Sequence, residues 1–275
     1  MDLSIVIVNW NTKKFVLDAI ESIIKSTPKV SYEIVVVDNA SSDGSVDALN
    51  RLSKEHSHVV VLPQKTNLGF ATGTNVGIKR SKGKNILLLN SDTKVKKGAL
   101  ESLVDFANKT KYLGAVAPKL LNADGSTQES VFRFPSISLA IRQYYLKSGN
   151  FLDKYAPPTK EATKVDICVM AAFLVPQKVI QDVGLLDEGY KMYFEDFDYC
   201  QRLKRAGLDV YYLPTAEVYH YHGQSGKELV ESENQWRRLI PGSKRFHGSF
   251  KHYIINFIIW SGQKFWKKQA STSKR

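Results

Sequence analysis

Apolar runs alternate with amphipathic stretches along the first part of the chain. The apolar runs at residues 3–8, 32–37, 59–62 and 85–89 each stop at a polar segment. Continuous runs of this kind are typical of strands buried on both faces of a parallel sheet. The stretches between them repeat apolar residues at intervals of three and four, which predicts helices with one buried face. The sequence therefore predicts an α/β fold, with a mainly parallel sheet flanked by helices.

Polar residues collect where the predicted strands end. They form the segments at residues 38–45, 67–78 and 90–92. Ligands of parallel sheets bind beyond the carboxyl ends of the strands. Asp38 could therefore accept hydrogen bonds from the base or ribose of a nucleotide. Asp92 is well placed to bind a hard divalent cation. Strand-end turns explain the same residues without any ligand. The glycines of residues 67–78 match neither a P-loop nor a dinucleotide fingerprint.

The second half contains a compact group of carboxylates. Apolar residues recur every third position from residue 197, which predicts a helix over about 195–206 that stops at Gly207. Glu195, Asp196 and Asp198 would lie in its first turn. Carboxylates there stabilise the positive end of the helix dipole. They also suit a general base, so both roles remain open at this point.

Length and composition describe an ordinary globular protein. The 275 residues are 43% hydrophobic and 24% charged, which suits one large α/β domain with an appendage. Cys168 and Cys200 have apolar or aromatic neighbours and no metal-ligand spacing, so we expect reduced core residues. The chain enters a strand within a few residues of Met1 without a signal peptide, from which we expect a cytoplasmic protein.

The positive charge is concentrated at the end of the chain. The net charge is +12, and residues 227–275 contain eleven Lys or Arg against three Glu. The apolar run at residues 253–260 is too short to span a bilayer, which takes about 20 residues in a helix. Together with the flanking lysines and three aromatic residues, it favours binding to the surface of an anionic membrane. The aromatic residues are Trp260, Phe265 and Trp266. A helix packed on the preceding domain is the alternative. No nucleic-acid module is present, so we expect no nucleic-acid partner.

Several segments combine into a family resemblance. These are VIVNWN, VVVDNASSDGS, NLGFATGTNVGI and LLLNSDT, followed by TQESVFRFPS, VDICVMAAFLVP, MYFEDFDYCQRLKRAG and VYHYHGQS. In this order they resemble glycosyltransferase family 2 with its GT-A (Rossmann-like) fold, and most of all its rhamnosyltransferase-like branch. The likeness covers about residues 1–225. It implies a glycosyltransferase domain at 1–226, with a nucleotide-binding half at about 1–121 and an acceptor half at about 122–226. The remainder, 227–275, would be a basic amphipathic extension.

The resemblance implies an inverting sugar transfer in cell-surface glycan synthesis. The donor would be a nucleoside diphosphate sugar, either dTDP-rhamnose or a UDP-sugar, and the acceptor a hydroxyl of a lipid-linked or polysaccharide molecule. The enzyme would then lie peripherally on the inner face of the cell membrane. A catalytically inactive nucleotide-sugar-binding protein of the same fold is the alternative. The resemblance assigns the donor contacts to Asn9, Asp38, Asn67, Gly69, Asn90 and Asp92.

The resemblance also implies a divalent metal, Mg²⁺ or Mn²⁺, at the donor diphosphate. Asp92 matches the last carboxylate of the family's Asp-x-Asp motif, whereas Asn90 replaces the first and removes one negative charge from the site. His220 matches the family's His-x-x-Gly-x-Ser motif and is the second candidate ligand. His222 is the second choice for this ligand. The alternative is that His220 has only a structural role.

The catalytic base would come from the carboxylates at the start of the predicted helix. The family's Glu-Asp pair matches Glu195 and Asp196, and the resemblance gives Asp196 the role of base. Glu195 would orient the acceptor, and Asp198 would be structural. Residues 137–158 lack a clean period, and their second half suggests a loop over the acceptor side.

Overall fold

The computed structural model describes residues 1–26, 29–149, 151–190, 192–221 and 235–272. Within these residues the sheet order is β3-β2-β1-β4-β10-β6-β11-β5, with β8 paired to β11 and a separate β7-β9 pair. The strands are β1 Leu3–Asn9, β2 Tyr32–Asp38, β3 Val59–Pro63, β4 Asn85–Asn90, β5 Thr93–Val95, β6 Leu113–Leu121, β7 Val131–Phe132, β8 Thr163–Val165, β9 Ile167–Cys168, β10 Ala172–Pro176 and β11 Asp209–His220.

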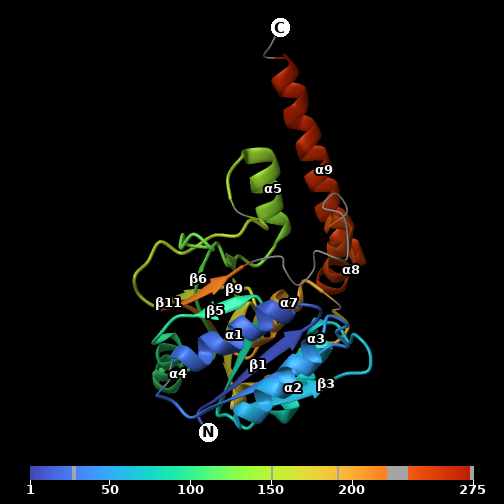
Figure 1. Ribbon diagram of the computed structural model, residues 1–275. Coiled ribbons are helices and arrows are strands. Elements are labelled where there is room, and N and C mark those ends of the chain that lie inside the picture. The colour runs from blue at the N-terminus through green and yellow to red at the C-terminus, as the bar shows by residue number, and fades with distance from the viewer. Residues whose placement is uncertain (27–28, 150, 191, 222–234, 273–275) are drawn as a thin grey trace.

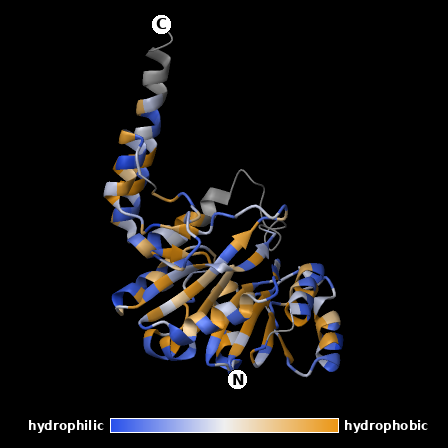
Figure 2. Cartoon of the chain, turned by 90° about the vertical axis from the view of Figure 1, so that its left-hand side faces the viewer, coloured by the Kyte–Doolittle hydropathy of each residue, from blue (hydrophilic) through white to orange (hydrophobic). Residues whose placement is uncertain are grey.

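The helices cover both faces of the sheet, as predicted (Figure 1). Residues of α1, α2 and α4 belong to the apolar core on one face, and residues of α3, α6 and α7 belong to the core on the other. Figure 2 shows the hydrophobic positions concentrated in the strands between these layers. The helices are α1 Lys13–Ser26, α2 Ser45–Glu55, α3 Phe70–Arg80, α4 Ala99–Lys109, α5 Ile137–Leu146, α6 Gln177–Val183, α7 Glu195–Arg205, α8 Gln235–His247 and α9 Ser249–Thr272.

The pairing of the central strands aligns their carboxyl ends. β1 is parallel to β2 with Asn9 opposite Asp38, and parallel to β4 with Val8 opposite Asn90. Strand β10 is antiparallel to β4 and β6, while β11 runs parallel to β6. The ends of β1, β2, β4 and β11 therefore lie along one edge of the sheet.

Residues 137–158 differ from the prediction, because their first part forms helix α5. Ser136 caps this helix by accepting a hydrogen bond from Leu139 N at 3.1 Å. Its apolar residue Ala140 packs with Phe151 and with residues of α9. Tyr145 donates to Ser261 Oγ at 2.6 Å across 116 positions of sequence. A partner so distant leaves no local period, which is why the sequence did not show this helix.

Helices α5 and α9 together form an arm that projects from the sheet domain (Figure 1). Helix α9 mixes hydrophobic and hydrophilic positions along its length (Figure 2). In the described part of the chain, none of the helices combines the length and apolar character that crossing a membrane requires.

Helix α8 fastens the root of the arm to α7 and to the loop before it. Arg245 donates from Nε and Nη2 to Asp187, both at 2.8 Å. The ring of Phe246 lies 5.7 Å from that of Phe194 and 5.9 Å from that of Phe197. A Cβ on Gly242 would lie 2.9 Å from the carbonyl oxygen of residue 193, so only glycine allows this close approach.

Candidate active site

The ends of β1 and β2 form a fully buried polar pair. Asn9 Nδ2 donates to Asp38 Oδ2 at 2.6 Å, and Ser41 N donates to Asp38 Oδ1 at 2.8 Å. Neither Asn9 nor Asp38 has exposed surface. The Asp38 carboxylate therefore holds the loop that follows β2 in place at the sheet edge.

A second loop lies against the first. Gly69 N donates to Asn67 Oδ1 at 2.9 Å, and Asn39 Nδ2 donates to the carbonyl oxygen of Gly69 at 3.0 Å. Gly69 has a φ of 79°, a backbone conformation that favours glycine. The Oδ1 atom of Asn39 is buried and makes no hydrogen bond to the described residues. Asn39 thus joins two loops that the sequence assigned to the nucleotide, although it was not itself singled out.

The carboxylate after β4 meets the histidine that ends β11. His220 Nε2 lies 3.5 Å from Asp92 Oδ1 and 3.5 Å from Asn90 Nδ2. Both side chains are buried, with 7% of His220 and 2% of Asp92 exposed. Antiparallel pairing of β11 with β5 sets His220 opposite Thr93 and creates this contact. The structure therefore brings together the two predicted metal ligands.

Thr12 links this group to the nucleotide loops. Its hydroxyl donates to Asn9 Oδ1 at 2.7 Å and lies 2.9 Å from the hydroxyl of Ser91. These contacts hold the Thr12 side chain at the sheet edge. The Asn9–Asp38 pair and the residue before Asp92 are therefore parts of one continuous polar cluster.

Gln128 determines which nitrogen of His220 carries the proton. Its Nε2 donates to Asn122 Oδ1 at 2.9 Å and to the carbonyl oxygen of His220 at 3.1 Å. Its Oε1 consequently accepts from His220 Nδ1, at 2.7 Å. The lone pair of His220 then lies on Nε2, directed at Asp92, as in histidines that bind metals.

This donor set fits Mg²⁺ or Mn²⁺. An aspartate oxygen and an imidazole nitrogen converge on one point, and cations of this kind take their other ligands from water and substrate phosphates. Among the described residues no group of three or more His, Cys, Asp or Glu forms a metal cluster. His222, Gly223 and Ser225 lie outside the described residues.

The carboxylate pair lies at the amino end of α7. The other end of α7 connects to the start of β11 through residues 206–208, so the amino end of α7 lies toward the edge of the sheet where β11 ends. The two residues before the pair, Tyr193 and Phe194, have φ angles of 67° and 70°. This left-handed backbone is strained for bulky side chains. Contacts from α8 hold it in place.

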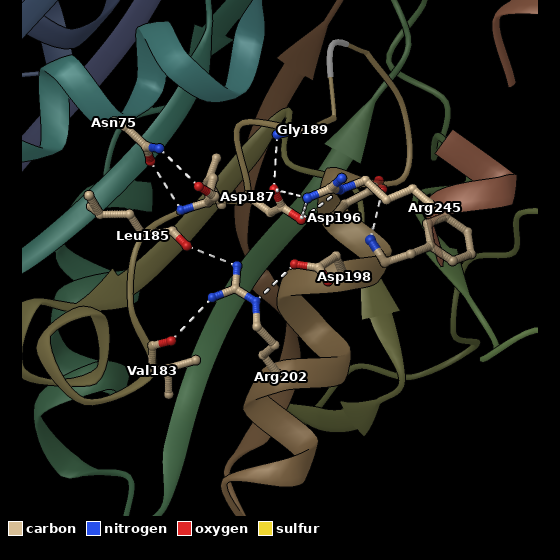
Figure 3. A network of polar contacts seen from close by, with 11 residues as sticks. Asn75, Val183, Leu185, Asp187, Gly189, Asp196, Asp198, Arg202 and Arg245 are labelled. Atoms are coloured by element: carbon tan, nitrogen blue, oxygen red, sulfur yellow. Dashed lines mark hydrogen bonds and ion pairs between the residues drawn. The ribbon is translucent and has the colours of Figure 1, made fainter. Parts of the chain in front are cut away.

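A network of hydrogen bonds fixes α7 against the preceding loop (Figure 3). Arg202 donates from Nε to Asp198 at 2.8 Å, and its other nitrogens donate to the carbonyl oxygens of Val183 and Leu185. Asn75 on α3 binds the same loop through both backbone groups of Leu186. These bonds commit Asp198 to an ion pair within the helix, which supports the structural role expected for it.

Burial raises the pKa of both members of the carboxylate pair, to about 8 for Glu195 and about 6 for Asp196. The negative charge of Asp196 raises the pKa of Glu195 further, while a hydrogen bond from Phe197 N and the charge of Lys154 lower that of Asp196. Glu195 Oε2 is buried without a hydrogen bond to the described residues. The pair therefore holds one proton near neutral pH, on Glu195, and leaves Asp196 ionised.

Sequence reasoning missed Gln128 and Lys154. Gln128 lies inside a segment that carried the family resemblance, and a polar side chain in that segment was the available signal. Lys154 lies in the loop that returns from the arm. Its neighbour Tyr155 pairs with Val131 through backbone hydrogen bonds of 2.9 and 3.0 Å, which anchor the loop near α7. The sequence around Lys154 contains no pattern that would have identified this lysine as a neighbour of Asp196.

Residues 4–181 match the sequence model of the family described as Glycosyl transferase family 2. N-acetylglucosaminyl-diphospho-decaprenol L-rhamnosyltransferase of Mycobacterium tuberculosis is 27% identical over 209 residues, which cover 70% of this chain and 67% of that protein. Poly(ribitol-phosphate) beta-glucosyltransferase of Bacillus spizizenii is 28% identical over 236 residues, which cover 80% of this chain and 35% of that protein. The chain thus spans about two thirds of the first relative and about a third of the second.

Two groups of solved structures share the fold. GalNAc-T7 with UDP, GalNAc and Mn²⁺ matches with a TM-score of 0.67 at 18% identity, over 90% of this chain and 47% of that one. Residues 1–349 of TarS from S. aureus in complex with UDP match with a TM-score of 0.60 at 17% identity, over 94% of this chain and 70% of that one. At these identities the likeness establishes the fold alone.

We expect Gln128→Leu to weaken Mn²⁺ binding by about ten- to a hundredfold, because His220 would lose the acceptor that fixes its tautomer. Gln128→Glu keeps an acceptor oxygen and should retain most of the affinity. Electron paramagnetic resonance titrations with UDP or dTDP present measure this. Equal affinities for the Leu variant and the unchanged protein would remove Gln128 from the role.

We expect Glu195→Gln to stabilise the protein at pH 8. Between pH 4.5 and about 8 the unfolded chain ionises this group while the folded chain keeps it protonated. Stability is thus lost as pH rises through that window, and Gln removes the loss. Urea unfolding should show a gain of about 1–3 kcal/mol at pH 8 that vanishes near pH 4. The exposed Glu55→Gln should show neither effect, and a gain independent of pH would contradict the assignment.

Proposed function

Because the chain belongs to glycosyl transferase family 2, we propose that it transfers a hexosyl group from a nucleoside diphosphate sugar to an acceptor hydroxyl in cell-surface glycan synthesis. Its fold is the GT-A fold expected from the sequence, which GalNAc-T7 and TarS share. One observation carries the proposal. Asp92, His220 and the Asn9–Asp38 pair form one polar edge of the sheet, and the amino end of α7, which begins with Glu195 and Asp196, lies toward that edge.

The donor would bind along this edge. Its nucleoside would contact the loops fixed by Asp38 and by Asn67 and Gly69, and its diphosphate would lie near Asn90 and Asp92. A divalent cation held by Asp92 and His220 would neutralise charge on the departing diphosphate. Asn90 occupies the position of the family's first carboxylate and carries no charge. Asp92 would therefore supply the negative charge to the cation, and His220 would supply a neutral nitrogen.

Asp196 would act as the base on the acceptor side. The acceptor hydroxyl gives its proton to the Asp196 carboxylate and attacks the anomeric carbon from the side opposite the leaving diphosphate, which inverts the configuration. Lys154 favours the ionised form of Asp196. Protonated Glu195 would donate a hydrogen bond that orients the acceptor.

The donor sugar and the acceptor follow less directly. The L-rhamnosyltransferase of M. tuberculosis supports a rhamnosyl donor, for which we propose dTDP-rhamnose, and a lipid-linked acceptor. The glucosyltransferase of B. spizizenii supports a glucosyl donor, and the UDP complex of TarS supports a UDP-sugar. A lipid-linked acceptor would place the enzyme peripherally at the inner face of the cell membrane. An inactive nucleotide-sugar-binding protein is the second candidate, favoured by the single observation of Asn90 in place of a carboxylate.

We expect Asp196→Asn to lower kcat by at least about a thousandfold with little change in donor binding, because the base is lost and the donor contacts remain. Asp198→Asn is the matched control. It breaks the ion pair with Arg202 and should lower stability while most of the turnover survives. Steady-state kinetics and calorimetric donor binding separate the two results, and near-normal turnover by Asp196→Asn would exclude the mechanism.

Calorimetric titration with UDP, dTDP and GDP, with and without Mn²⁺, tests the donor site. We expect one nucleotide to bind at least about tenfold more tightly with the metal, and Asp92→Asn to abolish this gain. The exposed Asp105→Asn should leave it unchanged. A dTDP preference would support dTDP-rhamnose, and a UDP preference would support a UDP-sugar. Failure of all three nucleotides to bind would refute the donor site.

A further inference from the structure

An exposed row of aromatic side chains runs along α9. Phe250, Tyr253, Phe257 and Trp260 follow one another at intervals of three and four, so they share one face of the helix. Their exposed fractions are 81%, 59%, 64% and 54%. We call these four residues the aromatic stripe. Single exposed apolar residues are ordinary on protein surfaces, but a contiguous row of large ones marks an interaction site.

The four side chains of the stripe are mostly exposed and are not part of the apolar core that α9 forms with α5. The opposite face of α9 makes the contacts with α5, where Ile255 and Ile258 are buried against Ala140. Further along, Trp266 Nε1 donates to the carbonyl oxygen of Tyr144 at 2.9 Å. The sequence grouped Trp266 with the membrane-facing aromatics, whereas its indole packs on α5. Helix α9 is therefore apolar on two faces, and one of them is exposed.

The charge of this segment identifies the kind of partner. Residues 235–275 contain ten Lys or Arg and neither Asp nor Glu, while the other 234 residues contain 29 basic and 27 acidic ones. Lysines lie beside the stripe itself. Lys244 Nζ donates to the Tyr253 hydroxyl at 3.0 Å, and Lys264 Nζ lies 4.1 Å from the centre of the Trp260 ring.

We propose that the aromatic stripe docks on the surface of a bilayer containing anionic lipids, with α9 lying in the plane of the interface. Aromatic rings with polar tips lodge at the boundary between headgroups and acyl chains, and lysines beside them reach anionic headgroups. At 1.5 Å per residue the stripe is about 15 Å long, which suits a helix lying on a membrane. A second copy of the chain fits poorly, because it would bring two wholly basic segments together.

Docking would also set the orientation of the acceptor site. Helix α8 joins α9 to α7 through the Arg245–Asp187 pair and the packing of Phe246 on Phe197. A docked arm therefore holds the Asp196 end of α7 at a fixed height above the lipid. This consequence rests on the proposed function, whereas the docking itself does not.

Flotation of the full chain with vesicles tests the docking without donor or acceptor, so its outcome is independent of catalysis. We expect the protein to float with vesicles of phosphatidylcholine and phosphatidylglycerol in equal parts. Phosphatidylcholine alone, or high salt, should weaken binding at least about tenfold. The double variant Phe257→Ser with Trp260→Ser should lose at least about tenfold in affinity for the anionic vesicles.

Two controls keep the test decisive. Tyr112 is also an exposed aromatic, remote from the arm in sequence and with a φ of 56° that asparagine tolerates, so Tyr112→Asn should bind as the unchanged protein does. Lys244→Gln with Lys264→Gln removes only charge and should weaken binding to the anionic vesicles. Absence of flotation, equal binding by the aromatic variant, or a dimer in sedimentation that the same aromatic substitutions dissociate would each overturn the proposal.

Discussion

Parallel pairing of β1 with β2 and with β4 is the constraint on which the site depends. The register sets Asn9 opposite Asp38 and Val8 opposite Asn90, so the polar segments after β1, β2 and β4 begin at the same level of the sheet, with that of β1 in the middle. A shift of one residue would turn the side chains of a strand to the other face of the sheet. The apolar cores on both faces oppose that shift, and they thereby fix the positions of Asn9, Asp38 and Asn90 at the edge.

The polar edge contains a buried network of hydrogen bonds. Asp38, Asn9, Thr12 and Ser91 form a chain of contacts from β2 to the residue before Asp92. Leaving one such buried group unpaired costs about 1–3 kcal/mol, more than a typical surface substitution. Residues that the sequence assigned to nucleotide binding therefore also stabilise the loops. This double duty explains why Asp38 is fully buried although the resemblance names it as a donor contact.

Sequence reasoning succeeded where the cause of a structure is local. Continuous apolar runs predicted the parallel strands, and a period of three predicted α7 within one residue of its observed end. Order along the chain placed Asp92 at a strand end and His220 in a motif. The sequence did not predict three features, because each depends on residues that meet only after folding. These are helix α5, the Gln128–His220 hydrogen bond and the position of Lys154. The two faces of α9 were equally hidden, since an apolar run without period does not say which side packs.

The C-terminal segment is more than an appendage to this site. Two bulky residues in left-handed backbone precede Glu195, and a strained turn persists only when its surroundings hold it. Those surroundings come from α8, through the packing of Phe246 on Phe194 and the close approach at Gly242. Gly248, with a φ of 76°, separates this helix from α9, which carries the aromatic stripe and packs on α8 through the contacts of Ser243 with His252 and of Lys244 with Tyr253. Helix α8 therefore contacts both the strained turn before Glu195 and the helix that carries the stripe.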